Sequence, residues 1–176
     1  MALEPHDIVV ANDAAIGAGR YVSPRANIVR TMHLGQPIFF AVDNPDDVIQ
    51  SEHFAGRFYE PEELDIIRRV FPNGGHYLDI GANVGNHVLY LEKFMHARKI
   101  VVIEPNPQAI ALLEANIFLN GIEGVCDRSK LGIGLSDGTT DCAFIRVGQN
   151  NLGGARVKEG TGDIPLASAD ELLGDE

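Results

Sequence analysis

The sequence predicts an α/β fold in which parallel strands are covered by helices on both faces. Three observations support this fold class. Segments of helix and strand character alternate from residue 61 onward, a glycine-rich loop follows the first of these strands, and an acidic residue closes the next strand. Parallel neighbouring strands need a long crossover connection, so strands that alternate with helices indicate a parallel sheet.

The alternation begins with a helix at residues 61–71, PEELDIIRRVF. Pro61 suits the first helical position, and the early acidic and late basic residues complement the helix dipole. Stop signals at Pro72 and Gly74 end this helix. The apolar segment HYLDI, residues 76–80, follows as the first predicted central strand and runs into the glycine loop.

Two more helices flank a second central strand. Residues 86–95, NHVLYLEKFM, read as a helix, and residues 99–105, KIVVIEP, read as a buried strand. The next helix, residues 107–120, has Asn106 as its candidate N-cap and Gly121 as its C-terminal stop. This β-α-β-α order is the strongest part of the fold prediction.

The remaining segments are shorter. Residues 125–136, VCDRSKLGIGLS, are expected to hold a third parallel strand. The runs CAFIRV, residues 142–147, and NNLGGARV, residues 150–157, predict a hairpin around a turn rich in Gly and Asn. The tail ASADELLGDE, residues 167–176, predicts a short capped helix.

Residues 1–60 mix short apolar runs with turn-forming Gly and Pro residues, which predicts short strands and loops. We therefore divide the chain into a β-rich N-terminal extension at residues 1–60 and the N-terminal part of an α/β domain at residues 61–176. Neither an internal repeat nor a linker rich in Gly, Pro or Ser separates the two parts.

Composition narrows the range of partners. The chain carries 14 basic and 25 acidic residues, a net charge of −11, with a pI near 4.9. This balance argues against a nucleic-acid backbone or an anionic membrane as the main partner. The sequence shows neither an apolar run of about 20 residues nor a secretory signal pattern, which favours a soluble, cytoplasmic protein. The 2 cysteines and 6 histidines lack metal-ligand spacing, so no metal site is expected.

The loop LDIGANVGNH, residues 78–87, stands where a strand ends and a helix begins, the place at which such folds bind ligands. Gly81 and Gly85 allow a sharp turn and a close approach of the backbone, and the first helical amides suit an anionic group. In S-adenosylmethionine that group is the amino-acid carboxylate. Asp79 offers a carboxylate for the ligand's ammonium group, while Asn83 offers both a donor and an acceptor. A tight βα turn without a ligand is the alternative reading of the same glycines.

Glu104 closes the second strand nineteen residues after Gly85, near the spacing at which an acidic residue meets ribose hydroxyls. Taken alone, a Glu at a strand end is more often a solvated charge. The dinucleotide fingerprint G-x-G-x-x-G is broken here because Asn83 and Asn86 stand at its second and third glycine positions. The sequence also lacks a phosphate-binding P-loop. An adenosyl cofactor with an amino-acid tail, S-adenosylmethionine, therefore fits best.

The ordered set FYEPEE, LDIGANVGNH, VVIEPNP, LEANIFLNG, GLSDG and NNLGG resembles the FkbM-type S-adenosylmethionine-dependent methyltransferases over roughly residues 40–175. The resemblance implies a Rossmann-like, class I methyltransferase fold and O-methylation of a small-molecule, sugar or polyketide-like acceptor. It assigns the first cofactor motif to the glycine loop, the ribose contact to the acid that follows, and a closing segment to the Tyr-Glu pair before the first helix. The expected cofactor-binding residues are Asp79, Gly81, Asn83, Gly85, Asn86, Glu104, Pro105, Asn106, Tyr59 and Glu60.

The sequence departs from this family after its last helix, where a further central strand with a KIDVEG-like motif is expected and no such motif occurs. The resemblance thus predicts a sheet truncated after about three core strands, with an open edge at HYLDI that a missing C-terminal half or a homo-oligomer covers. Alternatives are a non-catalytic S-adenosylmethionine-binding module or fragment, and a structural remnant that binds no cofactor. The general base and other catalytic residues are not assigned.

Overall fold

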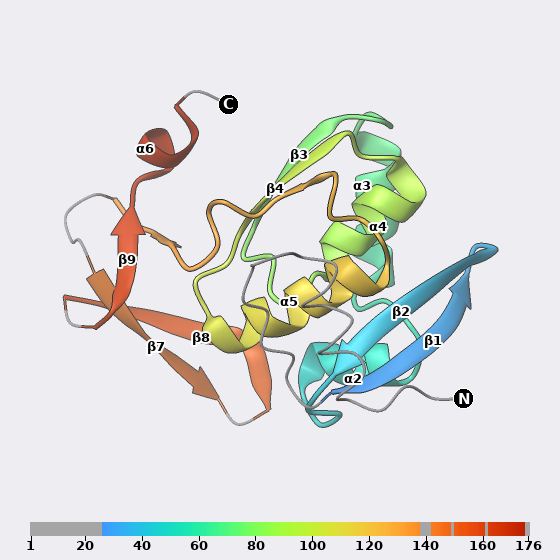
Figure 1. Cartoon of the computed structure of the whole chain (residues 1–176), viewed down its shortest axis with the longest axis horizontal. Helices are drawn as coiled ribbons and strands as arrows, with labels where there is room; N and C mark the ends of the chain where they lie inside the picture. Colours follow the sequence, from blue (N-terminus) through green and yellow to red (C-terminus); the bar gives the residue numbers. More distant parts are fainter. Residues whose placement is uncertain (1–25, 138–141, 149, 161, 175–176) are drawn as a thin grey trace.

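The computed structural model describes residues 26–137, 142–148, 150–160 and 162–174, which form a small α/β domain flanked by two β-hairpins (Figure 1). Its elements are β1 (Asn27–His33), β2 (Gln36–Val42), α2 (Val48–Phe54), α3 (Pro61–Val70), β3 (His76–Ile80), α4 (Asn86–Met95), β4 (Lys99–Ile103), α5 (Pro107–Leu119), β5 (Cys126–Asp127), β6 (Gly134–Leu135), β7 (Cys142–Gly148), β8 (Asn151–Glu159), β9 (Ile164–Ala167) and α6 (Ala169–Leu173).

The central sheet has three parallel strands in the order β3-β4-β5, as the alternation predicted. Ile80 pairs in register with Ile103, so β3 and β4 end side by side, and the loops that follow them meet at one edge. Because the strand order is consecutive and crossovers of this kind are right-handed, α4 and α5 lie on the same face of the sheet. The third strand is only two residues long.

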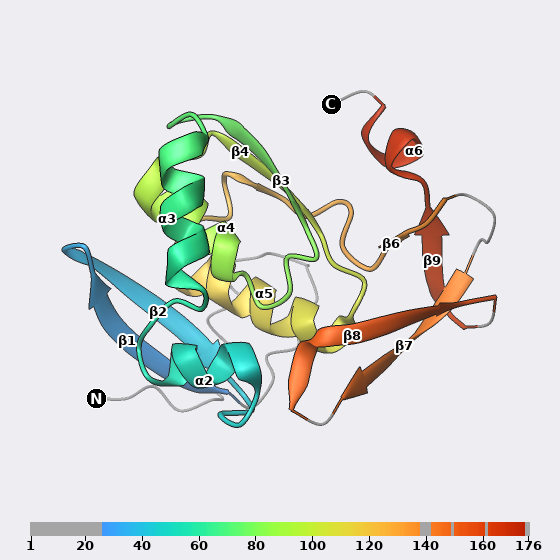
Figure 2. The ribbon, with the colours of Figure 1, turned by 180° about the vertical axis from the view of Figure 1, so that it is seen from behind.

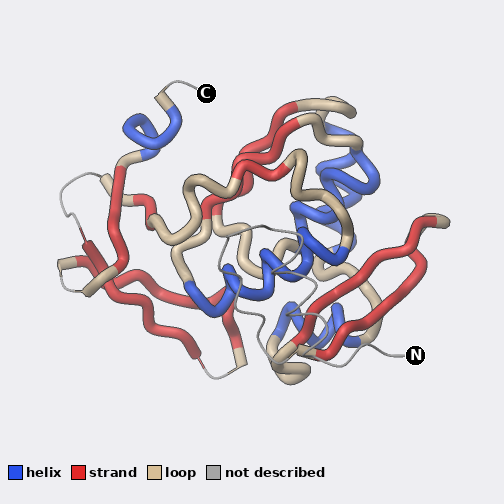
Figure 3. The backbone as a smooth tube through the Cα atoms, in the orientation of Figure 1, coloured by secondary structure: helices blue, strands red, loops and turns tan. Residues whose placement is uncertain are grey.

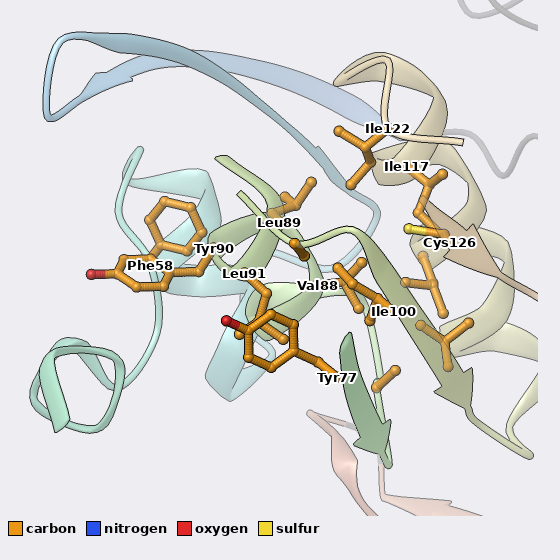
Figure 4. Packing of buried hydrophobic residues seen from close by; sticks show 14 of the residues in the cluster. Phe58, Tyr77, Val88, Leu89, Tyr90, Leu91, Ile100, Ile117, Ile122 and Cys126 are labelled. Carbon is orange, nitrogen blue, oxygen red and sulfur yellow. The ribbon is translucent and has the colours of Figure 1, made fainter. Parts of the chain in front are cut away.

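The main core lies between that face and the helices. Tyr77 and Ile100, paired across β3 and β4, pack in one buried cluster with Val88 of α4 and with Leu113 and Ile117 of α5. Figure 4 shows Tyr77, Ile100, Val88 and Ile117 among the apolar side chains that converge from the sheet and the helices. The alternating side-chain directions of a strand explain why Tyr77 enters this core while its neighbours His76 and Leu78 are exposed.

The opposite face of the sheet is covered unevenly. Val101 of β4 is buried, whereas Leu78 and Ile80 of β3 are 43% and 56% exposed. The short helix α6 contributes Leu173 to a groove that Leu78 and Val101 also line, on the far side of the sheet from α3 and α4 (Figures 1 and 2). Helices therefore flank both faces, and β3 forms an edge of the sheet, with Leu78 and Ile80 exposed on its outer face.

The N-terminal hairpin joins the same core. Strands β1 and β2 pair antiparallel, and Phe40 of β2 belongs to the same buried cluster as Leu113 of α5. The expectation of strands and loops is wrong for residues 48–54, which form helix α2. Asp47 caps this helix by accepting bonds from the amides of Ile49 and Gln50, and this local cap outweighs a weak helical pattern. The domain boundary at residue 60 stays a prediction.

The C-terminal part forms a second sheet in the order β6-β9-β7-β8 (Figure 3). The predicted hairpin is present as the antiparallel pair β7 and β8, and the predicted tail helix is α6, whose N-terminus carries a capping box between Ser168 and Glu171. Within the part of the chain that the structure describes, every helix is too short or too polar to cross a membrane.

Candidate functional site

The site begins at the loop after β3, where the backbone makes a sharp turn. Gly81, Asn83 and Gly85 all have positive φ, at 76°, 48° and 89°. Gly85 is also required by packing, since a Cβ there would lie 2.8 Å from a methyl carbon of Leu113. A Cβ at Gly81 would meet nothing within 4 Å. Packing therefore explains Gly85, while Gly81 leaves the backbone open to a ligand.

Glu104 ties this loop to the turn after β4. Its Oε2 accepts the backbone N–H of Asn83 and its Oε1 accepts that of Asn106, both at 2.8 Å. The residue is only 7% exposed. Burial raises the pKa of the Glu104 carboxyl, and the charge of Asp79 raises it further, against the opposing effect of the two backbone bonds. The two predicted acidic residues are therefore electrostatic neighbours.

Asp79 is the second acid of the site. Its Oδ2 is covered and accepts no hydrogen bond. Burial raises the pKa of the Asp79 carboxyl, and the neighbouring His87 lowers it by a smaller amount. Among the described residues, the ion pairs of Lys and Arg involve neither Asp79 nor Glu104. The site thus holds two carboxylates that a cationic ligand would stabilise.

Three polar atoms around the loop lack hydrogen-bond partners. They are Oδ2 of Asp79, Oδ1 of Asn83 and Nδ2 of Asn106. The Oδ1 of Asn106 is used instead to cap α5, where it accepts the amide of Gln108. Buried polar atoms are nearly always paired in folded proteins, and among the described residues three of the six unpaired side-chain atoms lie here, where a ligand with both donors and acceptors would pair them.

Asn86 and Tyr59, two of the residues expected to bind the cofactor, lie side by side and are hydrogen-bonded to each other. The Oδ1 of Asn86 accepts the amide of Tyr59 at 2.9 Å and lies 3.0 Å from Nε2 of His53, while its Nδ2 donates to the carbonyl of Tyr59. Both ends of the Asn86 amide are therefore engaged with protein. Glu60 follows with φ of 51° and precedes the first residue of α3, so this segment is held against the start of α4.

A cavity of about 360 Å³ lies beside Asp79, between α3, β3 and the start of α4. His87, in the first turn of α4, also lines it. Pro105, predicted to lie beside the adenosine, is partly buried between Glu104 and the cap residue Asn106. The cavity is lined by Glu63, Ile67, Phe71, Tyr77, Leu78, Asp79, Ile80, His87 and Leu91. The residues that the structure describes include no cluster of His, Cys, Asp and Glu arranged to hold a metal ion.

Sequence reasoning missed two buried polar residues that support the site. Asp47 caps α2, and its second carboxylate oxygen accepts the amide of Leu152 at 2.7 Å. His53 is fully buried and stacks on Phe40 with ring centroids 4.2 Å apart. Burial lowers the pKa of His53 to about 4. The run of two aspartates before VIQS was a capping signal for Asp47, whereas His53 carried no signal in the sequence.

Comparison with known proteins places this site in a methyltransferase-like domain. Residues 47–132, just under half of the chain, match the model of the TRM5/TYW2 methyltransferase domain. This segment contains the glycine loop, Glu104 and Asn106. No curated protein matches the chain.

Solved structures that match the chain at low similarity include TYW2 and Trm5 proteins. Methanocaldococcus jannaschii TYW2 in complex with AdoMet has a TM-score of 0.41 and 20% identity, covering 60% of this chain and 44% of that one. M. jannaschii Trm5 in complex with adenosine has a TM-score of 0.36 and 22% identity, and the match covers 60% of this chain and 30% of that one. The complex of aTrm5 with tRNALeu has a TM-score of 0.38 and 23% identity, and the match covers 63% of this chain and 29% of that one. This chain thus spans less than half the length of each.

These findings confirm some predictions and correct others. The class I methyltransferase-like α/β fold is confirmed, and the predicted S-adenosylmethionine agrees with the AdoMet-bound TYW2 structure. The assignment to the FkbM family is wrong, because the matching model is that of the TRM5/TYW2 domain. The prediction of a small-molecule acceptor without nucleic acid is wrong as well, since the similar structures include a Trm5 bound to tRNA. The residues behind the prediction, the glycine loop and the acid that follows it, were assigned to a cofactor, and a cofactor motif carries no information about the acceptor.

Proposed function

We propose that this chain binds S-adenosylmethionine where β3 and β4 end, as the cofactor-binding part of a TRM5/TYW2-type methyltransferase that acts on tRNA. The observation that carries the proposal is the pair of buried carboxylates, Asp79 and Glu104, which no Lys or Arg of the described residues neutralises. S-adenosylmethionine brings two cationic groups, an ammonium and a sulfonium, to such a site. The unpaired atoms of Asp79, Asn83 and Asn106 fit a ligand with several polar groups.

Each of these residues would bind a different group of the ligand. Asp79 would hold the ammonium group through its unpaired Oδ2. Each oxygen of Glu104 accepts one backbone bond and keeps a lone pair for a ribose hydroxyl. The first amides of α4 would meet the amino-acid carboxylate, and Gly81 leaves room for it. The bound cofactor supplies the methyl group on its sulfonium, while this chain orients it and excludes water.

The tRNA acceptor is supported by the match of residues 47–132 to a domain model of the TRM5/TYW2 type. With a net charge of −11, contacts to tRNA phosphates require a local basic surface rather than the overall charge of the chain. Transfer of an isotope-labelled methyl group from S-adenosylmethionine to bulk tRNA tests this acceptor. Labelling of protein or of free nucleosides in place of tRNA would contradict it.

Binding is tested by calorimetric titration with S-adenosylmethionine, adenosine and NAD. Wild-type protein should bind the first two and not the third. Asp79→Asn should weaken binding of S-adenosylmethionine by about tenfold and leave adenosine unchanged, because adenosine has no ammonium group. Glu104→Gln should weaken both ligands. Asp65→Asn, which changes a partly exposed carboxylate on α3 that is paired with Arg68, is the control. A folded wild-type chain that binds neither adenosyl ligand would overturn the proposal.

A second candidate, cofactor binding without turnover, is favoured by one observation. Strand β3 forms an edge of the central sheet, and its Leu78 and Ile80 side chains are largely exposed. An acceptor site that requires a neighbour on this edge is then incomplete in the described residues. Saturable binding of S-adenosylmethionine with no methyl transfer to tRNA supports this candidate, and turnover by the same preparation excludes it.

A further inference from the structure

The first residues of β8 lie against the glycine loop, although they are far away in the sequence. An added Cβ at Gly153 would stand 2.7 Å from Nδ2 of Asn83 and 3.2 Å from a methyl carbon of Ile49. Real side chains do not approach this closely, so no side chain fits at Gly153 unless Asn83 moves. Figures 1 and 2 both show the start of β8 beside α2.

Two bonds hold β8 in this place. The carboxylate of Asp47 accepts the amide of Leu152 at 2.7 Å, and the amide of Val48 donates to the carbonyl of Asn150 at 3.3 Å. Asp47 is 1% exposed, and its other oxygen caps α2, so its position is determined by the helix. Since a buried charge-assisted bond is among the stronger hydrogen bonds, the start of β8 is fixed to α2.

We propose that Gly153 is a positioning residue of the cofactor site, acting through the side chain of Asn83. This inference rests on the proposed function. With no side chain at position 153, the Asn83 amide lies against β8 with its Oδ1 free for a ligand. The backbone N–H of the same residue donates to Glu104, so Asn83 lies between β8 and the carboxylate proposed to bind the ribose. Asp47 keeps β8 at the distance that this contact requires.

The test is Gly153→Ala, with Gly124→Ala as its matched control. A Cβ at Gly124 meets nothing within 4 Å, and Gly124 does not have a positive φ. Gly153→Ala should weaken S-adenosylmethionine binding by roughly tenfold, the effect of about one lost hydrogen bond to the ligand, while Gly124→Ala leaves it unchanged. Urea unfolding of both variants shows that each is folded under the conditions of the titration.

A double-mutant cycle separates positioning from general damage. Asn83→Gly removes the side chain at a position whose φ of 48° suits glycine. If Gly153 acts through Asn83, Gly153→Ala should cause no further loss of affinity in the Asn83→Gly background. The same penalty in both backgrounds, or no penalty in the wild type, would overturn the inference.

The contact itself is testable without a ligand. The side-chain amide resonance of Asn83, identified by its loss in Asn83→Gly, should shift in Gly153→Ala and stay in place in Gly124→Ala. An unchanged resonance in Gly153→Ala overturns the inference. If the variants show this shift pattern but the wild-type chain binds no adenosyl ligand, the proposed function is overturned while the contact between Gly153 and Asn83 stands. The two failures are therefore distinguishable.

Asp47→Ser tests the hydrogen bond by which Asp47 holds the start of β8. Serine still caps a helix but has only one oxygen, so the bond to Leu152 is lost while the cap is retained. The variant should weaken S-adenosylmethionine binding severalfold in the wild type and have no added effect in Asn83→Gly. Asp46→Ser, at the exposed neighbouring position, should change nothing. Equal losses in both backgrounds would show that Asp47 acts on the fold alone.

Discussion

Two groups of buried polar side chains in this domain differ in how completely they are hydrogen-bonded. Under α5, the amide of Asn116 accepts the N–H of Ala41 at 2.6 Å and donates to the carbonyl of Val84 at 2.7 Å. Asn120 pairs with the N–H and carbonyl of Phe39 in the same way. Around the glycine loop, by contrast, buried atoms of Asp79 and of its neighbours lack partners.

This difference in hydrogen bonding separates a structural group from a group suited to ligand binding. Asn116 and Asn120 fasten the N-terminal hairpin to α5, and a structural role requires complete pairing because an unpaired buried group costs stability. The loop group keeps unpaired atoms and carboxylates with raised pKa values, which costs stability in the absence of a ligand. We therefore expect substitutions in the two groups to change stability in opposite directions.

The largest effect is expected for Asn116→Ala. It leaves the N–H of Ala41 and the carbonyl of Val84 unpaired in the core, which should lower the free energy of unfolding by about 3 kcal/mol. Urea unfolding at neutral pH measures it. The exposed Asn27→Ala on β1 is the control. A loss below about 1 kcal/mol would mean that water replaces the missing amide.

His53 should make stability depend on pH. Its folded-state pKa of about 4 lies below the ordinary value of 6.5, so the unfolded chain takes up a proton between these values and the folded chain does not. Stability is therefore lost as pH falls from 6.5 to 4, by about 3 kcal/mol in total. His53→Phe, which can still stack on Phe40, should flatten the curve of unfolding free energy against pH. An unchanged slope would assign the pH dependence to other groups.

Asp79→Asn should raise stability at neutral pH while it weakens cofactor binding. The pKa of the Asp79 carboxyl is raised by burial, so its contribution is favourable at low pH and is lost as pH rises through the folded-state pKa. The neutral amide avoids this loss. The gain over the wild type should be largest at pH 7 and vanish in acid, as measured by urea unfolding. A variant less stable than the wild type at pH 7 contradicts this account.

The smallest effect is expected for Leu78→Thr on the outer face of β3. Leu78 is 43% exposed, so the change should alter the free energy of unfolding by no more than about 0.5 kcal/mol. Sedimentation velocity at several concentrations shows whether the wild type self-associates and whether the variant does so less. A loss of stability above about 1 kcal/mol would show that Leu78 is covered by another copy or segment in solution.

Much of the central fold was predictable because its signals are local. Asn106 and Gly121 mark the ends of α5 in the sequence, and the structure confirms both, with Asn106 as the N-cap and Gly121 in a left-handed conformation after the helix. Helix α2 was missed because its seven residues depend on one cap more than on an apolar stripe. In the site, the sequence predicted that the glycine loop and Glu104 serve one ligand, and the structure places Glu104 against the loop, where it accepts the amide of Asn83.

The α/β alternation, the sharp loop after β3 and the acid after β4 can be read from the amino-acid sequence, because each depends on residues near one another in the chain. The contacts between distant segments follow only from the folded domain. Asp47 meets Leu152 across 105 residues, Gly153 meets Asn83 through the same docking of β8, and the lowered pKa of His53 arises from burial. Which polar atoms remain unpaired for a ligand is a property of the packed domain, since pairing depends on neighbours that only folding brings together.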